Sequence, residues 1–157
     1  MTVQKGKLIG IARKGKPRVT MEELEGVEIG VAYGLEGDWR GPESGAKVDS
    51  RQVSVMAIED WNAACADVGR ELTWTVRRAN LLVERLALKE TEGALIQIGD
   101  VILRVIEETA PCSRMDEQVD GLKNALMADW RGGVCCTVEN GGIVKLGNVV
   151  AVETPGD

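Results

Sequence analysis

Two apolar runs, LIQI at residues 95–98 and VILRVI at residues 101–106, flank the pair Gly99-Asp100 near the middle of this chain. A Gly-Asp pair between two apolar runs is typical of a tight turn, so this stretch predicts a β-hairpin. Other short apolar segments lie on both sides of it and are separated by glycine-containing turns. They predict further strands at residues 7–12, 27–31, 51–56, 80–83, 134–139 and 143–152. Polar and apolar residues alternate at 51–56, which predicts one buried face there.

Two segments change to helical spacing. In Ile58–Val68 the apolar residues fall on one helical face, and Gly69 stands where a helix commonly ends. A second helical pattern covers Asp120–Trp130 and is ended by Arg131-Gly132-Gly133. Two helices among many short strands predict a mainly β architecture, either a barrel or a sandwich. The length of 157 residues fits one domain, which we expect to span residues 1–157.

The composition excludes several classes of function. The net charge of −6 argues against general nucleic-acid binding, which requires a basic face. The absence of histidine excludes Ser-His-Asp and Cys-His catalysis and histidine-ligated zinc. The apolar runs have the length of strands, so we expect no membrane span. The first seven residues have no apolar signal-peptide core, and we therefore expect a cytoplasmic location.

Cys112 is the strongest candidate for a reactive residue. It follows Pro111, which restricts the local backbone, and it precedes Arg114, a permanent cation that favours the thiolate form. A thiolate is a good ligand for a soft metal and a good acceptor of sulfur. The alternative is a small buried core residue, as free cysteines usually are.

The other three cysteines are expected to be structural. Cys135 and Cys136 are adjacent on a predicted strand, so their side chains should point to opposite faces, one of them toward the core. Cys65 lies on the apolar face of the first predicted helix. No pair has the C-x-x-C spacing of a zinc or thioredoxin-like motif.

A basic cluster, Arg77-Arg78-Ala79-Asn80, could hold a phosphorylated heteroaromatic ligand, because arginine offers a fork of donors suited to phosphate. Arg51, at the head of a predicted strand, is of the same kind. The alternative is a solvated charged edge, with arginine paired to Glu84 or Asp38. Gly132 and Gly133 are turn glycines that could also bring backbone N–H groups close to an anion.

Several of these motifs, taken in order, resemble one family. They are Gly34-Leu35-Glu36-Gly37-Asp38, Arg51-Gln52-Val53-Ser54-Val55, Arg78-Ala79-Asn80-Leu81, Ile98-Gly99-Asp100, Pro111-Cys112-Ser113-Arg114 and Arg131-Gly132-Gly133-Val134. This order resembles the MOSC domain, the C-terminal module of molybdenum cofactor sulfurase, which also occurs as stand-alone bacterial proteins. The resemblance covers roughly residues 6–153. It implies a closed, mixed β-barrel with a few short helices, of the type seen in the pyruvate kinase β-barrel.

The resemblance also implies a pocket for the pterin form of the molybdenum cofactor (molybdopterin). The cysteine that matches Cys112 is regarded in the family as a sulfur carrier or a molybdenum ligand. Arg78 and Asn80 resemble cofactor-contacting residues of amidoxime reductases, and we expect Arg51, Arg114, Gly132 and Gly133 to complete the cofactor site. Those reductases carry a second cysteine three residues after the first, where this chain has Met115.

Three hypotheses follow from the resemblance. The chain could be a molybdenum enzyme that reduces N-hydroxylated compounds, with electrons from a separate redox partner. It could be a non-catalytic carrier that takes sulfur from a donor protein or holds the cofactor for delivery. It could also be an interaction domain that has kept the fold without the ligand.

Overall fold

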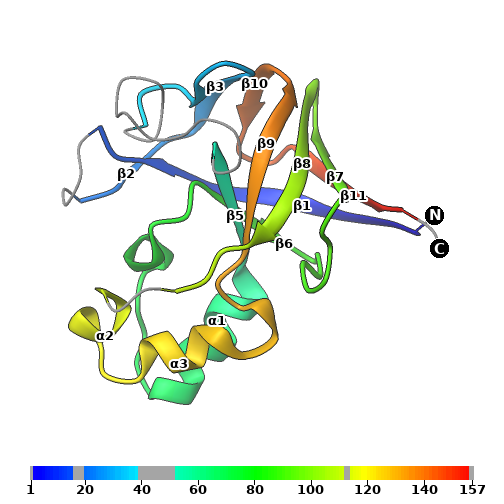
Figure 1. Cartoon of the computed structure of the whole chain (residues 1–157). Coiled ribbons are helices and arrows are strands. Elements are labelled where there is room, and N and C mark those ends of the chain that lie inside the picture. Colours follow the sequence, from blue (N-terminus) through cyan, green and yellow to red (C-terminus); the bar gives the residue numbers. More distant parts are fainter. Residues whose placement is uncertain (1, 16–19, 39–51, 112–113, 156–157) are drawn as a thin grey trace.

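The computed structural model describes residues 2–15, 20–38, 52–111 and 114–155. A β-barrel makes up one part of the molecule, and the helices gather on one side of it (Figure 1). None of the helices within the described ranges is long and apolar enough to cross a membrane.

The barrel is closed by seven strands. Hydrogen bonds link them in the cyclic order β1 (Thr2–Arg13), β11 (Val149–Thr154), β7 (Leu95–Ile98), β8 (Val101–Glu108), β9 (Val134–Asn140), β5 (Val53–Ala57), β6 (Leu81–Glu84) and back to β1. Every neighbouring pair is antiparallel except β5 and β6, which are parallel. The expected closed, mixed β-barrel is therefore confirmed, and so is the hairpin of β7 and β8 at Gly99-Asp100.

Short strands extend the barrel at the end where β1 finishes. β2 (Glu22–Glu23) pairs with Ala12 and Arg13 of β1. A separate small sheet has the order β10 (Gly142–Lys145), β3 (Gly26–Gly30) and β4 (Gly34–Leu35). The strand expected at residues 143–152 is thus two strands, and they belong to different sheets.

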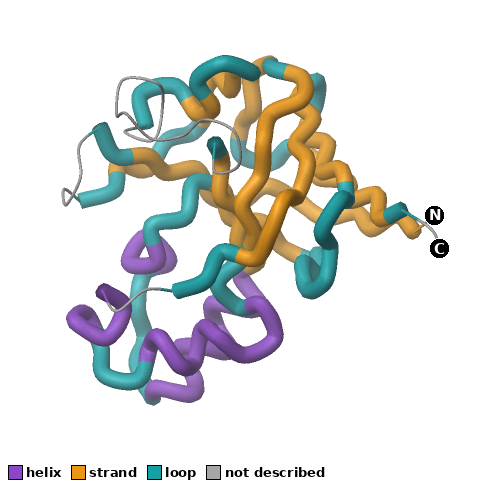
Figure 2. Tube along the Cα trace, in the orientation of Figure 1, coloured by secondary structure: helices purple, strands orange, loops and turns teal. Residues whose placement is uncertain are grey.

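The helices form a layer outside the barrel (Figure 2). They are α1 (Ile58–Val68), α2 (Arg114–Gln118) and α3 (Leu122–Met127), with the 3-10 turns η2 (Trp74–Arg77) and η3 (Ala128–Trp130). α1 has the predicted bounds, and Gly69 caps it with a φ of 68°, in the left-handed region that glycine favours. The second helical segment begins at Leu122 instead of Asp120 and is interrupted at Asp129, whose φ is 49°.

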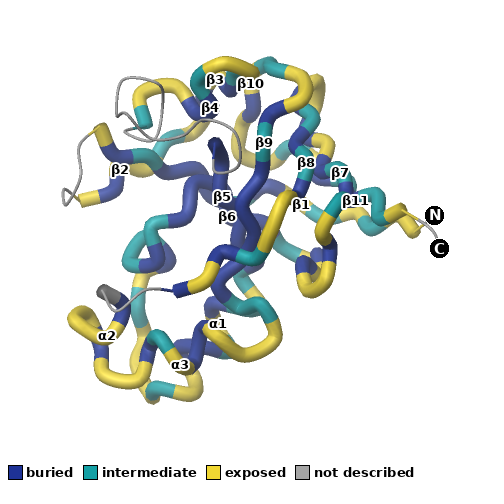
Figure 3. Tube along the Cα trace, in the orientation of Figure 1, coloured by how far each residue is buried: buried dark blue, intermediate teal, exposed yellow. Residues whose placement is uncertain are grey.

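Strands β5 and β6 are buried (Figure 3), and residues of each strand belong to two hydrophobic clusters. Val53, Val55 and Ala57 belong to the cluster inside the barrel, whereas Met56 belongs to the cluster that includes Trp61 of α1. All five residues of β5 are buried. The prediction of one buried face at 51–56 was therefore wrong, because helices cover the face that would otherwise meet water.

Candidate functional site

The segment that carries Cys112 begins where β8 ends. Cys112 and Arg51 both lie outside the described residues. Their described neighbours Pro111 and Gln52 are buried, and Arg114 is the first residue of α2. Thr109 and the residues that contact it therefore define the base of the Cys112 segment.

Each polar atom of Thr109 has a partner. Its N–H donates to the carbonyl of Gly133 at 2.8 Å, and its hydroxyl lies 3.0 Å from the thiol sulfur of Cys135. Its carbonyl accepts a 2.9 Å hydrogen bond from Nη2 of Arg77. Thr109 is buried, so these bonds replace water that the residue no longer meets. We call Arg77, Thr109 and Cys135 the loop clamp.

Arg77 is an interior residue. It ends η2 and is only 8% exposed, so the expected alternative of a solvated charged edge does not describe it. Its neighbour Arg78 is half-buried and adopts the left-handed region, with a φ of 71°, as the cap of η2. The two adjacent arginines therefore lie in different environments: Arg77 is buried in the loop clamp, and Arg78 is half-buried.

Gly132 and Gly133 pack against the loop clamp. A Cβ on Gly132 would lie 2.6 Å from the carbonyl oxygen of Thr109, and one on Gly133 would lie 2.2 Å from the carbonyl oxygen of Val55. Their N–H groups donate to the carbonyls of Leu126 and Trp130. The prediction that these N–H groups bind an anion gains no support from this arrangement, and the glycines allow close approach of the backbone instead.

Asn80 joins three strands beside the loop clamp. Its Oδ1 accepts from the N–H of Ser54 at 3.1 Å and lies 3.3 Å from the Ser54 hydroxyl. Its Nδ2 donates to the carbonyl of Ala12 at 3.2 Å. Asn80 is 2% exposed, so its amide serves the junction of β1, β5 and β6.

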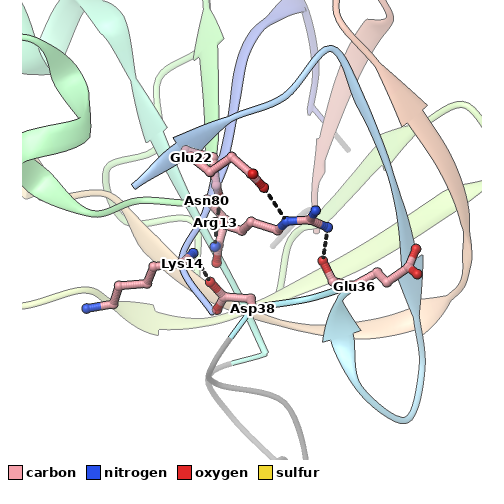
Figure 4. A network of polar contacts seen from close by, with 7 residues as sticks. Arg13, Lys14, Glu22, Glu36, Asp38 and Asn80 are labelled. Atoms are coloured by element: carbon pink, nitrogen blue, oxygen red, sulfur yellow. Dashed lines mark hydrogen bonds and ion pairs between the residues drawn. The ribbon is translucent and has the colours of Figure 1, made fainter. Parts of the chain in front are cut away.

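A buried lysine follows the end of β1, close to Asn80 (Figure 4). Lys14 is 3% exposed, and its backbone N–H donates to the carboxylate of Asp38 at 3.1 Å. Arg13 pairs with Glu22 at 2.8 Å and donates to the carbonyl of Glu36. A cavity of about 460 Å³ opens here, lined by Arg13, Lys14, Gly15, Thr20, Glu22, Glu36 and Gly37.

The described cysteines have different environments. Cys136 points into the barrel and is fully buried, and this burial, followed by the neighbouring Cys135, raises the pKa of its thiol. Burial also raises the pKa of Cys65, while a hydrogen bond from the backbone of Leu72 lowers it. The expectations that Cys65 is a core residue and that Cys135 and Cys136 face opposite sides are confirmed.

No group of three or more histidine, cysteine or acidic side chains is placed to bind a metal ion within the ranges that the structure describes. Met115 is 1% exposed and packs in the helix-side cluster. The position that holds a second cysteine in the amidoxime-reducing relatives is thus a core position here.

Residues 42–151 match the model of the MOSC domain family. This chain belongs to the MOSC domain family. Its fold is similar to the crystal structure of the YuaD protein from Bacillus subtilis, with 19% identity, a TM-score of 0.82 and 99% of each chain covered. YiiM from Escherichia coli is similar at 13% identity and a TM-score of 0.69, with 96% of this chain and 71% of that one covered. A search of curated proteins finds no significant match.

MOSC domains are associated with the molybdenum cofactor, which agrees with the resemblance drawn from the sequence motifs. In this MOSC domain, the structure brings Asn80 close to the end of β1, and it brings Gly132 and Gly133 close to Thr109. Sequence reasoning missed Lys14, Thr109 and the particular role of Arg77. The signal for Thr109 was its place three residues before Cys112, immediately after a predicted strand.

Proposed function

We propose that this MOSC domain binds the molybdenum cofactor, or the sulfur destined for it, at Cys112. The observation that carries the proposal is the loop clamp, which holds the base of the Cys112 segment beside Gly132 and Gly133. A segment anchored in this way can present its thiol from a fixed starting point on the barrel.

The basic residues of the site fit an anionic, phosphate-bearing ligand. Lys14 is buried and Arg78 is half-buried, in a protein whose net charge is −6. Arginine binds phosphate through paired donors, and lysine binds it as a compact charge. Arg78, together with Arg51 and Arg114, would hold the phosphate. Asn80 would act by fixing the strand ends, because its amide is already bonded to the protein.

The thiol chemistry fits the same group. In this proposal the metal arrives with its organic cofactor. Cys112 would add one thiolate, a ligand type that suits a soft metal. Met115 cannot act as a second ligand from its core position. When bound, the cofactor supplies a metal that can change its oxidation state by two electrons.

The activity that suits such a site is reduction of N-hydroxylated compounds. Replacing an N–OH group by N–H consumes two electrons and two protons and releases water, so a separate redox protein must supply the electrons. The alternative is a carrier. The Cys112 thiolate would take the outer sulfur of a persulfide on a donor protein, the donor's S–S bond breaking and its cysteine leaving as a thiolate, or Cys112 would hold the cofactor for delivery.

The decisive experiment measures molybdenum and pterin per chain in protein from a host that makes the cofactor. We expect wild type and the control Cys65→Ser to carry both, and Cys112→Ser to lose the metal. Cys65 is a suitable control because it is a buried cysteine on α1.

Two outcomes contradict the proposal in different ways. If Cys112→Ser keeps its molybdenum, Cys112 is not the ligand. If wild type contains neither metal nor pterin, the cofactor-bound form is excluded, and intact mass spectrometry then tests for one added sulfur atom on Cys112. A reductase must also consume an N-hydroxylated substrate, whereas a carrier binds or transfers without turnover.

A further inference from the structure

Arg77 occupies a position that family resemblance did not single out. The resemblance points to Arg78 and Asn80, yet Arg77 is the buried member of the pair and reaches across 32 residues of sequence to Thr109. In the sequence, only Ala110 and Pro111 stand between Thr109 and Cys112. Pro111 has no N–H to donate, whereas Thr109 makes three hydrogen bonds at the start of this stretch.

The three bonds of Thr109 come from different parts of the fold. Gly133 immediately precedes β9 and Cys135 lies near its start, whereas Arg77 belongs to η2. The backbone bond to Gly133 continues the sheet, since Glu108 already pairs with Val134. The bond from Arg77 is the one that attaches the departing chain to a different element.

The surroundings leave little freedom for this contact. A Cβ on Gly132 would lie 2.6 Å from the Thr109 carbonyl oxygen and 3.1 Å from Nη2 of Arg77. Glycine at 132 therefore leaves room for both partners of the hydrogen bond. A buried bond from a charged donor to a carbonyl is among the stronger bonds in proteins, because the charge is poorly screened there.

We propose that Arg77 is a positioning residue, whose bond to the Thr109 carbonyl fixes the course of the chain that leads to Cys112. The importance of this position rests on the proposed function of Cys112. Arg77 touches neither the cofactor nor the reacting thiol in this proposal; it acts through Thr109.

The test is hydrogen exchange of the cofactor-free protein, followed by mass spectrometry of peptides covering residues 107–119 and 95–106. In Arg77→Met we expect the amides of 107–119 to exchange about tenfold faster or more, because a charged hydrogen bond that restrains local opening is lost. The hairpin peptide 95–106 should keep its exchange rate. Arg77→Lys should restore most of the protection, since an ammonium group can still donate to the carbonyl.

Arg104→Met is the matched control. Arg104 also donates to a backbone carbonyl at 2.9 Å, that of Gly93, but at the hairpin of β7 and β8. The Arg104→Met substitution should leave the exchange rate of peptide 107–119 unchanged. If Arg77→Met does not fold, Gly132→Ala tests the same bond, because its added Cβ would lie 2.6 Å from the Thr109 carbonyl oxygen and 3.1 Å from Nη2 of Arg77. We expect it to speed the exchange of 107–119 and to leave that of 95–106 unchanged.

A second measurement is cofactor content after expression in a cofactor-producing host. We expect Arg77→Met to lose cofactor and Arg77→Lys to keep it. Unchanged exchange at 107–119 in Arg77→Met, or faster exchange of both peptides without rescue by lysine, would overturn the proposal. A wild type without cofactor would instead exclude the cofactor-bound form of the proposed function, and the exchange experiment separates the two failures.

Discussion

The two faces of β5 and β9 are built from different chemistry. Inside the barrel, Val53, Val55 and Cys136 belong to the apolar interior cluster. On the outer face, Ser54 bonds to Asn80, and Cys135 lies against the hydroxyl of Thr109. The comparison teaches that one pair of strands can stabilise the barrel with one face and hold the candidate site with the other.

Substitution at Gly133 should have the largest effect on the free energy of unfolding, because this residue precedes β9 and packs against the backbone of β5. Its φ is 89°, and a Cβ would lie 2.2 Å from the carbonyl oxygen of Val55. We expect Gly133→Ala to cost about 4 kcal/mol of unfolding free energy, from backbone strain together with steric overlap. Gly147, with a φ of 92° and open space around it, is the matched control. Gly147→Ala should cost about 1 kcal/mol.

Urea unfolding of the two variants measures both costs. Equal losses would mean that the close approach to β5 contributes nothing and that the backbone conformation alone requires glycine at 133. A larger loss for Gly133→Ala supports the view that this turn joins the barrel to the site.

Cys136→Ser and Cys135→Ser compare the two faces directly. Serine at 136 places a hydroxyl in the aliphatic interior, and we expect a loss of about 2 kcal/mol. Serine at 135 can still bond to Thr109, so its cost should be less than about 1 kcal/mol. Chemical denaturation at one pH gives both values. A reversed order would show that the outer face, not the interior, is the less tolerant of a polar change.

Much of the fold could be predicted because its signals are local. The Gly99-Asp100 turn and the bounds of α1 follow from neighbouring residues, and both were confirmed. The burial of both faces of β5 was missed because it depends on Trp61 and other helix residues that pack there. The break at Asp129 was missed as well; this residue pairs with Lys89, which is 40 positions away.

The candidate site was harder to predict than the fold. The sequence pattern indicates the basic cluster at 77–80, but it cannot distinguish adjacent arginines without the turn that buries Arg77 and leaves Arg78 half-buried. Lys14 belonged to a predicted turn, and its burial follows from contacts with a distant segment that includes Asp38. The roles of Cys112, Arg51 and Arg114 remain predictions that the cofactor measurement tests.

The smallest effect expected concerns the helix layer, where Asp60 of α1 is half-buried. The pKa of Asp60 is raised to about 6, chiefly by burial and then by the negative charge of Glu59, while Arg131 opposes the shift. Below the ordinary pKa of 3.8 the carboxyl is protonated in the folded and unfolded chains alike. As the pH rises from 3.8 to about 6, Asp60 ionises first in the unfolded chain. Its contribution to the free energy of unfolding therefore becomes unfavourable across this window.

Asp60→Asn should therefore stabilise the protein by about 1 kcal/mol near pH 8, a value reduced from the full shift because the side chain is partly solvated. Near pH 3 it should make no difference. Urea unfolding at both pH values measures the gain, and Asp100→Asn, in the exposed turn between β7 and β8, is the control. A gain of the same size at both pH values would mean that the asparagine packs better than the aspartate, and that ionisation of Asp60 does not weaken the helix layer.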